Sequence, residues 1–548
     1  MNVFCFHTDL PLDLRLSTKP LDSLPVNLST TNKKTMKKIT ACLFAALAIT
    51  AQAQDIYNIE SFSARDLNGT ARFVGMGGAM SALGADLSVM STNPAGTALY
   101  RRNDVATTLS LLAQPHAEKM QGIGRTRASF DQLGFVIATP LNFDNLEYVN
   151  FGINYHKARN FKNHIDVANH YTGGMSQSWQ MMDLAYANGW LDLDNNNDRD
   201  LTTPFTNLGY DTYMIDPIYD EEGNITGYEP SDADNYSYKR VQWGGTHQWD
   251  FNLSMNFSDR FYAGLTATYY DLNKRSYTDY TEQIINPADQ SLNDYYYTTD
   301  EHTDGEGYGA SFGLIWRPFE DNAFRVGLAI HTPVNYTIDV STDLYMDSPY
   351  ASNGQDYTAR GMNVTNYYEV ETPWRFNISA GGTIANAMAY GVEYEYQDAT
   401  SADVTYDDGF IKDHALGNEL ERTMKGVHNF KTGVEFRMIP QLAMRVGYNY
   451  VSSPFKRSAY LNHFLDSDNY YYATNTDYVN LSETHRVTWG LGFTYKKFTA
   501  DCAYMYQMQH ADVYAFHLPE AHASANRLDA SRVDLNQHKF MLTIGYKF

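Results

Sequence analysis

The chain has 548 residues, with 41 Lys and Arg against 64 Asp and Glu, and a formal net charge of -23 at pH 7. This charge argues against a nucleic-acid partner, because phosphate backbones attract basic surfaces. Mean hydropathy is -0.46, and no internal segment reaches the roughly 18 apolar residues of a membrane helix, which excludes a helical membrane protein. A membrane β-barrel stays open, because only every second strand residue must face lipid, and 43 Tyr and 28 Phe suit its aromatic girdles.

An export signal begins at Met36. Two lysines follow it, residues 39–50 are apolar, and residues 51–53 read A-Q-A, a signal-peptidase site. We therefore expect residues 36–53 to be a secretory signal peptide. Residues 1–35 lack these features of a signal peptide, and we interpret them as an N-terminal over-extension upstream of the true start.

The cysteines give no expected disulfide. A lipoprotein-like box at residues 39–42 would lipidate Cys42, but it lies at the start of the apolar stretch instead of its end. Cleavage after Ala53 or Gln54 removes Cys5 and Cys42. Cys502 then remains alone, so no intrachain disulfide is expected.

Residues 55–103 follow the signal and do not alternate between apolar and polar side chains. They contain the run GMGGAMSALGADLSVMSTNPAG at 75–96, in which glycines and small residues permit tight turns and close backbone packing. The Asn93-Pro94 pair initiates turns. We expect this segment to be a compact hatch inside a barrel bore, where its polar backbone meets a polar wall.

From residue 104 onward, fourteen segments alternate with period 2, the pattern of half-buried strands. Their lengths suit the roughly 9–11 residues of a tilted membrane strand. The expected strands are 104–114, 128–139, 147–157, 248–257, 261–271, 307–317, 323–335, 374–384, 388–398, 427–437, 442–451, 485–495, 498–508 and 537–548.

The connections between these strands alternate in length. The long ones are 115–127, 158–247, 272–306, 336–373, 399–426, 452–484 and 509–536. An outer-membrane barrel has short periplasmic turns and longer extracellular loops, and an even strand number leaves both termini in the periplasm. We therefore expect residues 104–548 to be an all-β, transmembrane antiparallel β-barrel of 14 strands in the bacterial outer membrane, with periplasmic N- and C-termini.

The two faces of the strands give the same prediction. In 248–257, Trp249, Phe251 and Leu253 share a face that suits lipid, and Asp250 and Asn252 share the other. Charged residues are costly on a lipid face and tolerated in a lumen. The charged side chains that fall on the inward phase are Arg325, Glu393, Arg445 and Asp501. The last strand ends in Phe548, a pattern that suits outer-membrane barrel-assembly machinery as a partner.

The run at 75–96 resembles the N-terminal segment of the outer-membrane long-chain fatty acid transporter family (FadL type, including related hydrocarbon transporters), whose members carry G-x-G-G-A followed by N-P-A-G. Later segments, among them FRVGLAIHTPVNY and HRVTWGLGFTY, resemble that family as well. The resemblance implies a fourteen-stranded barrel closed by an N-terminal hatch. The matching hatch positions are Gly75, Gly77, Gly78, Asn93, Pro94, Ala95 and Gly96.

The resemblance also implies passive uptake of hydrophobic molecules, long-chain fatty acids or similar compounds. In that family, outer loops capture the ligand, and a hatch movement with a lateral gap near the third strand releases it into the bilayer of outer-membrane lipid and lipopolysaccharide. Gly152 is the candidate for the gap. The 158–247 loop is rich in Asp, Asn and Tyr and departs from the family, which leaves the ligand open. A static plug, a non-specific porin and a surface binding or adhesion barrel that uses this loop remain alternatives.

The remaining motifs give weaker evidence for a function. Asp192, Asp194, Asn196 and Asp198 have the spacing of a calcium loop, but Asn197 and Thr203 stand where Gly and Glu are needed, so a solvated acidic turn is expected. The histidines near the last loop, His510, His517, His522 and His538, lack a compact ligand spacing for a metal or haem. No G-x-S-x-G or other nucleophile signature occurs. We therefore expect no metal, no cofactor and no enzyme activity.

Overall fold

The structure, a computed structural model, describes part of the chain. The described residues are 56–548 without 116, 142, 144, 172–174, 188, 287–288, 351–354, 386, 407–410, 464–471 and 518–527. The expected signal peptide at 36–53, the start at 1–35, Cys5 and Cys42 lie outside the described residues. Cys502 is free and exposed.

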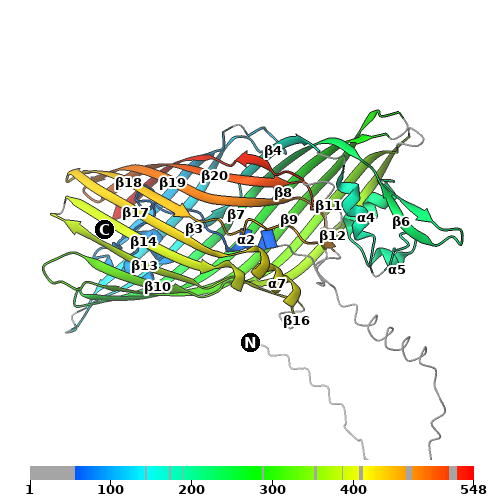
Figure 1. The fold of residues 1–548 in the computed structure, drawn as a ribbon. Coiled ribbons are helices and arrows are strands. Elements are labelled where there is room, and N and C mark those ends of the chain that lie inside the picture. The colour runs from blue at the N-terminus through cyan, green and yellow to red at the C-terminus, as the bar shows by residue number, and fades with distance from the viewer. Residues whose placement is uncertain are drawn as a thin grey trace, which may run out of the picture. The chain divides into compact units, whose positions relative to one another are not determined.

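Antiparallel strands close into a barrel, because the first and the last strand pair with each other. β1 (Asp104–Ala113) pairs with β2 (Thr126–Pro140) on one side and with β22 (Gln537–Lys547) on the other. Fourteen strands form the wall (Figure 1), and five of them are interrupted once and carry two labels.

The strands between β2 and β22 complete this wall. In chain order they are β3 with β4 (Leu146–Asn160, Asn163–His170), β7 (Ala233–Phe257), β8 (Phe261–Ile285), β9 (Leu292–Trp316), β10 with β11 (Arg325–His331, Asn335–Tyr350), β12 with β13 (Gln355–Glu371, Arg375–Ile384), β14 with β15 (Met388–Asp398, Asp403–Tyr406), β17 (Gly426–Ile439), β18 (Leu442–Val451), β19 (Tyr478–Tyr495), β20 (Phe498–Tyr514) and β21 (Ser531–Asp534), which continues into β22. All fourteen expected strands are present at their expected places, which confirms the fold class.

Several strands are longer than the alternation predicts. β7, β8 and β9 have 25 residues each, so the prediction of loops at 272–306 and 336–373 is wrong for most of their length. The physical reason is an inversion of the two faces. Outside the bilayer the outward side chains meet water and are polar, while tyrosines such as Tyr238 and Tyr280 point inward and are buried.

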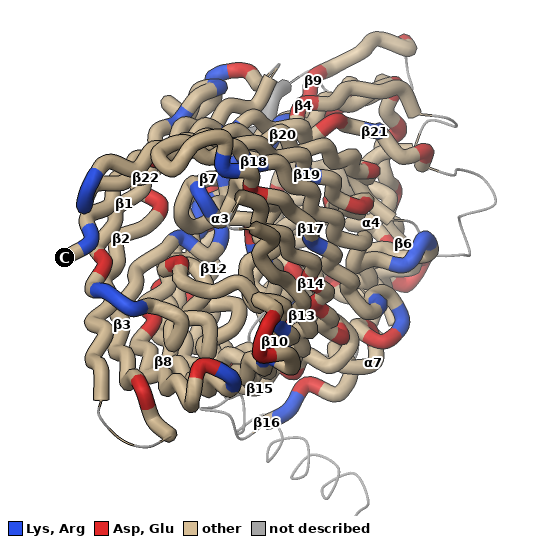
Figure 2. Tube along the Cα trace, turned by 90° about the vertical axis from the view of Figure 1, so that its left-hand side faces the viewer, with Lys and Arg blue, Asp and Glu red and all other residues tan. Residues whose placement is uncertain are grey.

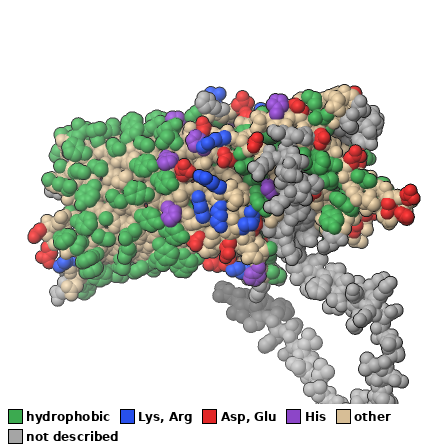
Figure 3. Space-filling view, viewed as in Figure 1, with side chains coloured by type: hydrophobic (Ala, Val, Ile, Leu, Met, Phe, Trp, Pro, Cys, Tyr) green, Lys and Arg blue, Asp and Glu red, His purple; other side chains and the backbone are tan. Residues whose placement is uncertain are grey.

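An apolar belt surrounds the half of the barrel that carries the C-terminus (Figure 3). On β7, Trp249 is 40% exposed and Phe251 46%, whereas Asp250 and Asn252 are buried. The same alternation holds on β19, where Trp489 is exposed. The predicted assignment of faces is confirmed, and the belt is the surface that a barrel needs in an outer membrane.

The charged residues expected in the lumen point inward. Arg445 donates from Nε to Glu435 and from Nη1 to Asp501, with donor–acceptor distances of 2.8 and 2.6 Å. Arg325 donates to the carbonyl of Leu83 in the hatch. Glu393 accepts from Lys431 Nζ at 2.7 Å. These pairs offset the cost of placing charges at membrane depth.

The end of the barrel opposite the C-terminus is closed by part of the 158–247 segment (Figure 1). This outer lid, residues 175–232, comprises α4 (Gln177–Leu184), α5 (Asn196–Arg199), α6 (Pro204–Asp211) and the hairpin of β5 (Ile215–Tyr219) and β6 (Ile225–Pro230). Its core side chains Met181 and Phe205 pack with Tyr295 and Met346 from the luminal face of the wall. The helices of the lid therefore pack against the outer wall, while the tip of the β5–β6 hairpin extends beyond the end of the barrel (Figure 1).

A second helical connection lies between β15 and β17. It holds the short β16 (Ile411–Lys412) and α7 (His414–Thr423), and η3 (Ala399–Ser401) precedes β15. Leu416 and Leu420 of α7 pack in one core with Ile59 of the N-terminal segment. Among the described helices, none has the length and apolarity needed to cross a membrane.

Candidate functional site: the hatch and the cavity beside it

The N-terminal segment lies inside the bore. It comprises α2 (Ile56–Ser63), α3 (Ala71–Gly75), η1 (Leu87–Ser91) and η2 (Pro94–Leu99). Figure 2 looks into the barrel from the end that carries the C-terminus and shows α3 surrounded by wall strands. Ala71 N donates to Thr543 Oγ1 at 2.7 Å, and Thr488 Oγ1 donates to the carbonyl of Gly75 at 3.3 Å. The expected luminal hatch is present.

A row of wall glycines receives the glycine turn of the hatch. Gly433 on β17 and Gly447 on β18 are direct cross-strand partners, and Gly391 on β14 continues the row. A Cβ on Gly433 would lie 2.2 Å from the carbonyl oxygen of Met76, and one on Gly447 would lie 2.1 Å from the nitrogen of Gly77. Side chains at these wall positions would occupy the space of the hatch backbone, so glycine makes the groove.

The hatch turn itself needs glycine. Gly77 and Gly78 have φ angles of +64° and +82°, which side-chain-bearing residues rarely adopt. A Cβ on Gly77 would also lie 2.7 Å from Tyr448 N of β18. The sequence identifies the hatch glycines by the motif, but their wall partners lie hundreds of residues away, and only the strand register aligns them.

The N-P-A-G motif is a capped turn that docks on a different part of the wall. Asn93 is the N-cap of η2, and its Oδ1 accepts from Ala95 N at 3.1 Å. Its Nδ2 donates to the carbonyls of Leu314 and Leu328 at 3.3 and 3.4 Å. One side chain thus caps the start of η2 and fastens it to β9 and β10, as a luminal docking segment requires.

The next motif residues also fit a glycine-lined surface. The carbonyl of Pro94 accepts from Asn252 Nδ2 at 3.2 Å. Gly264 on β8 and Gly313 on β9 are cross-strand partners. A Cβ on Gly264 would lie 2.4 Å from Pro94, and a Cβ on Gly313 would lie 2.1 Å from Asn93 Oδ1. Gly96 packs on Val89, and a Cβ on Gly96 would lie 2.8 Å from the Val89 side chain. Both hatch motifs are therefore sites of close approach to the wall.

An ion-pair chain ties α3 to the wall. Arg72 Nε lies 3.0 Å from Glu435 Oε2, and the same carboxylate oxygen accepts from Arg445 at 2.8 Å. Asp501 binds the other side of Arg445. Removing one member of a buried pair leaves an unpaired charge. Any displacement of α3 must break the contact between Arg72 and Glu435.

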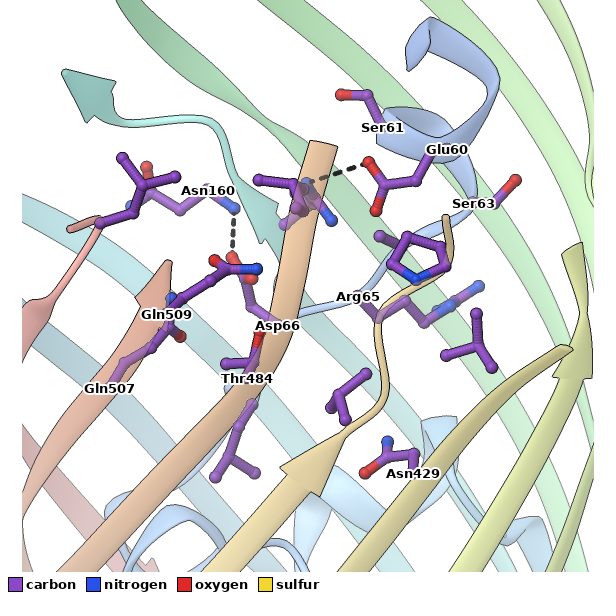
Figure 4. Close-up of a pocket in the computed structure, with 18 of the residues that line it drawn as sticks. Glu60, Ser61, Ser63, Arg65, Asp66, Asn160, Asn429, Thr484, Gln507 and Gln509 are labelled. Carbon is purple, nitrogen blue, oxygen red and sulfur yellow. Dashed lines mark hydrogen bonds and ion pairs between the residues drawn. The ribbon is translucent and has the colours of Figure 1, made fainter. Parts of the chain in front are cut away.

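A cavity of about 180 Å³ lies between the hatch and the wall. Figure 4 shows Glu60, Ser63, Arg65 and Asp66 on the hatch side, facing Thr484 and other residues of the wall strands. Aliphatic and aromatic side chains share the lining: Ile59, Leu67, Leu112, Phe161, Leu481, Met505 and Leu535. The cavity is therefore amphipathic.

Basic groups exceed acidic groups around this cavity. The basic side chains are Arg65, Arg159, Lys162, Arg375, Arg486 and Lys539, and the acidic ones are Glu60, Asp66 and Glu395. Figure 4 draws the contact of Glu60 with Arg159, 3.9 Å, and that of Asp66 with the backbone of Asn160, 2.8 Å. Arg486 Nη2 stands 3.9 Å from Asp66, while its Nε donates to Gln507 at 2.7 Å. A carboxylate or phosphate guest would find several guanidinium donors.

Gly152, the gap candidate, lies in a continuous part of the sheet. It pairs with Val136 of β2 and with Asn252 of β7, and a Cβ there would lie 2.3 Å from Met90 of the hatch. In this structure Gly152 is thus a point of close hatch approach.

A discontinuity lies further along the same strand pair. Among the described residues, β2 and β3 form no pair beyond Gln132 and His156. The register shifts around Asp131 of β2 and around Ala158 of β3, as in β-bulges, which terminate pairing and occur beside functional sites. Side chains bridge the break instead of backbone: Lys157 Nζ donates to Ser129 Oγ at 2.8 Å. We call residues 126–131 with 157–160 the side break.

The acidic turn and the described histidines make contacts with neighbouring protein groups. Asp198 and Asp192 accept hydrogen bonds from backbone nitrogens within the turn, and no group of three or more metal-ligating side chains occurs within the described ranges. His510 pairs with Asp534 at 2.5 Å, His517 stacks on Tyr460 at 3.8 Å, and His538 binds Tyr504 at 2.6 Å. His522 lies outside the described residues.

No family model and no curated protein matches the chain. Among solved structures, a FadL homologue of Pseudomonas aeruginosa is similar, with a TM-score of 0.50, 12% identity, and 88% of this chain and 99% of that chain covered. The toluene transporters TbuX of Ralstonia pickettii (TM-score 0.43, 11% identity) and TodX of Pseudomonas putida (TM-score 0.42, 12% identity) are also similar, each with the same two coverages. The likeness to the FadL homologue shows that this chain shares the fold of that protein.

Proposed function

We propose that this chain is a passive outer-membrane channel for hydrophobic molecules that carry an acidic group, long-chain fatty acids or similar compounds. The observation that carries the proposal is the amphipathic cavity beside the hatch. Its aliphatic part would bind a hydrocarbon tail at about 25 cal/mol per Å² of buried apolar surface. Its excess of basic groups favours an acid over a neutral hydrocarbon.

The route we infer has three steps. The ligand enters past the outer lid, occupies the cavity, and leaves when the hatch moves and the side break widens. The side break begins two residues from Tyr155, at the outer edge of the apolar belt, so a released ligand would enter the outer leaflet near its headgroups. The C-terminus would face the periplasm, at the end of the barrel with the short turns.

Two obstructions favour this route over an open porin. Within the described residues the hatch occupies one part of the bore and the lid core another. We therefore expect rare openings in a planar bilayer, whereas a steady large ohmic conductance would favour the porin. The packing of the lid helices against the wall strands favours a cover of the bore over an adhesion loop.

The sharpest test of lateral release removes the bulge at the side break. Deleting Ala158 should bring β3 back into register with its neighbours and abolish uptake of radiolabelled palmitate by cells that depend on this protein. Deleting Met438, at the register shift between β17 and β18, is the matched control and should leave uptake unchanged. Unchanged uptake after the Ala158 deletion, in a barrel that still resists denaturation, would refute release at this site.

The ligand class is tested separately by mass spectrometry of lipids that co-purify with the protein. Enrichment of free carboxylic acids supports the proposed class, and enrichment of uncharged hydrocarbons contradicts it. Arg486→Gln should reduce the amount of bound acid, because it removes a guanidinium from the cavity wall.

A further inference from the structure

The outer edge of the apolar belt carries a repeated side-chain pair. Tyr394 and His428 lie between β14 and β17, Tyr448 and His485 between β18 and β19, and Tyr504 and His538 between β20 and β22. In each, the tyrosine hydroxyl and the imidazole Nδ1 are hydrogen-bonded, at 2.8, 2.7 and 2.6 Å. We call these three pairs the tyrosine–histidine arc.

The arc has one geometry repeated on consecutive hairpins. Each histidine is flanked by a second tyrosine two residues further along the first strand, with ring centroids 5.3, 5.2 and 4.9 Å apart for Tyr396, Tyr450 and Tyr506. The pairs recur at every second strand, about 10 Å apart along the edge. Tyr155 and His247 form a fourth pair of this kind between β3 and β7, at 2.7 Å.

The hydrogen bond orients each imidazole. When the tyrosine hydroxyl donates to Nδ1, the proton of a neutral ring lies on Nε2, which is left to donate to another group. His428 is exposed, and His485 and His538 are half-buried. The purple side chains at the edge of the green belt in Figure 3 show histidines at this level.

Basic side chains lie just beyond the arc on the same face. Lys425 precedes β17, and Lys456 and Arg457 follow β18; all three are exposed, beside the exposed carboxylates Glu421 and Glu483. Figure 3 shows lysine and arginine side chains gathered next to the belt there. In a chain with 64 acidic and 41 basic residues, these three exposed cations beside the tyrosine–histidine arc offer positive charge to an anionic partner.

We propose that the tyrosine–histidine arc, with these flanking cations, binds the phosphate groups of outer-leaflet glycolipids. The arc continues the apolar belt, so its partner must offer acyl chains below the edge and anionic acceptors above it. A lipid with a phosphorylated headgroup has both, and charge-assisted hydrogen bonds to phosphate are the strong ones. This inference goes beyond the proposed transport and does not depend on it.

The test uses the full chain in neutral detergent and native mass spectrometry. The probes are lipid A with two phosphates, the same lipid after enzymatic removal of its phosphates, and inorganic phosphate. We expect the phosphorylated lipid to bind about tenfold more tightly than the dephosphorylated one, the effect of one charge-assisted hydrogen bond. Replacing the three arc histidines by glutamine should remove most of this difference.

Matched variants keep the test specific. Lys496→Ala with Lys497→Ala removes two cations from the turn between β19 and β20, at the other end of the barrel, and should leave lipid binding unchanged. Tyr448→Phe and Tyr504→Phe, which remove only the orienting hydroxyls, should weaken binding by an intermediate factor. Equal binding of the two lipids, an equal loss in the lysine control, or full competition by inorganic phosphate at lipid concentration would overturn the proposal.

Discussion

Replacing Gly447 by alanine tests whether the hatch is a movable gate. The new Cβ would lie 2.1 Å from the nitrogen of Gly77, whereas ordinary contact begins at 3.4 Å. The hatch turn must therefore retreat by the difference, 1.3 Å, or the strand must bend. The turn cannot retreat without loosening its contacts with β17 and β18.

The expected cost is that of overpacking, about 1–3 kcal/mol. Because the clash exists only while the hatch is seated, this energy acts on the equilibrium between the seated and the displaced hatch. A shift of 1–3 kcal/mol multiplies the displaced population by about 5–150. Open events in planar bilayers should become more frequent by that factor, and the urea midpoint of unfolding should fall.

The control is Gly490→Ala on β19, because its Cβ would lie at an ordinary 3.5 Å from Gly75 of the hatch, and its only tight contact, 3.0 Å to the carbonyl oxygen of Cys502, lies within the wall. It should change the opening frequency little. If Gly447→Ala lowers stability while the openings stay as rare as before, the hatch is a static plug and gated passage is wrong. If both alanines act alike, the argument from close approach fails.

Three further outcomes are expected. Burial raises the pKa of Glu282, on β8 outside the belt, to about 7. Its Oε1 accepts from Gln177 N at the start of α4 in the lid at 2.9 Å. Lid docking is therefore strongest below pH 4.5 and weakens as pH rises through 7, and Glu282→Gln should abolish this trend in amide exchange of α4. Asn93→Ala removes the η2 cap and should lower stability by about 1 kcal/mol in urea unfolding. Asn93→Asp keeps the cap but sets a buried carboxylate against the carbonyls of Leu314 and Leu328, so it should lower stability further. Phe251→Arg on the lipid face should lower the free energy of unfolding in vesicles by about 2–4 kcal/mol. Thr281→Arg, beyond the belt, should change it by no more than about 0.5 kcal/mol. Equal losses for the two variants would contradict the assigned belt.

The sequence predicts the strands best within the membrane, because the bilayer constrains each strand separately. Trp249 and Phe251 must face lipid and Asp250 must not, so the period-2 pattern predicts each membrane segment from about ten residues. The same reasoning stopped at the membrane edge. Beyond it Tyr238 and Tyr280 turn inward and the polarity of the two faces inverts, so the period-2 pattern predicts loops where the strands continue.

Part of the hatch can be predicted from the sequence. Its glycines and its N-P-A-G turn announce a compact segment before the barrel, and its luminal place followed from the resemblance. No local sequence pattern identifies Gly433 and Gly447 as the wall positions that contact the hatch, because glycines occur in strands for many other reasons. The side break was equally hidden, since a bulge depends on the register of two strands and not on either one alone.

The sequence by itself determined the number of strands, the face of each that meets lipid, and the presence of a small-residue segment ahead of them, because these depend on periodicities within one segment. Only the tertiary structure decided which wall positions touch the hatch, where the sheet is broken, how the outer lid packs against the wall and which side chains share the cavity. These features arise from residues far apart in the chain, brought together by barrel closure, and no local pattern encodes that closure.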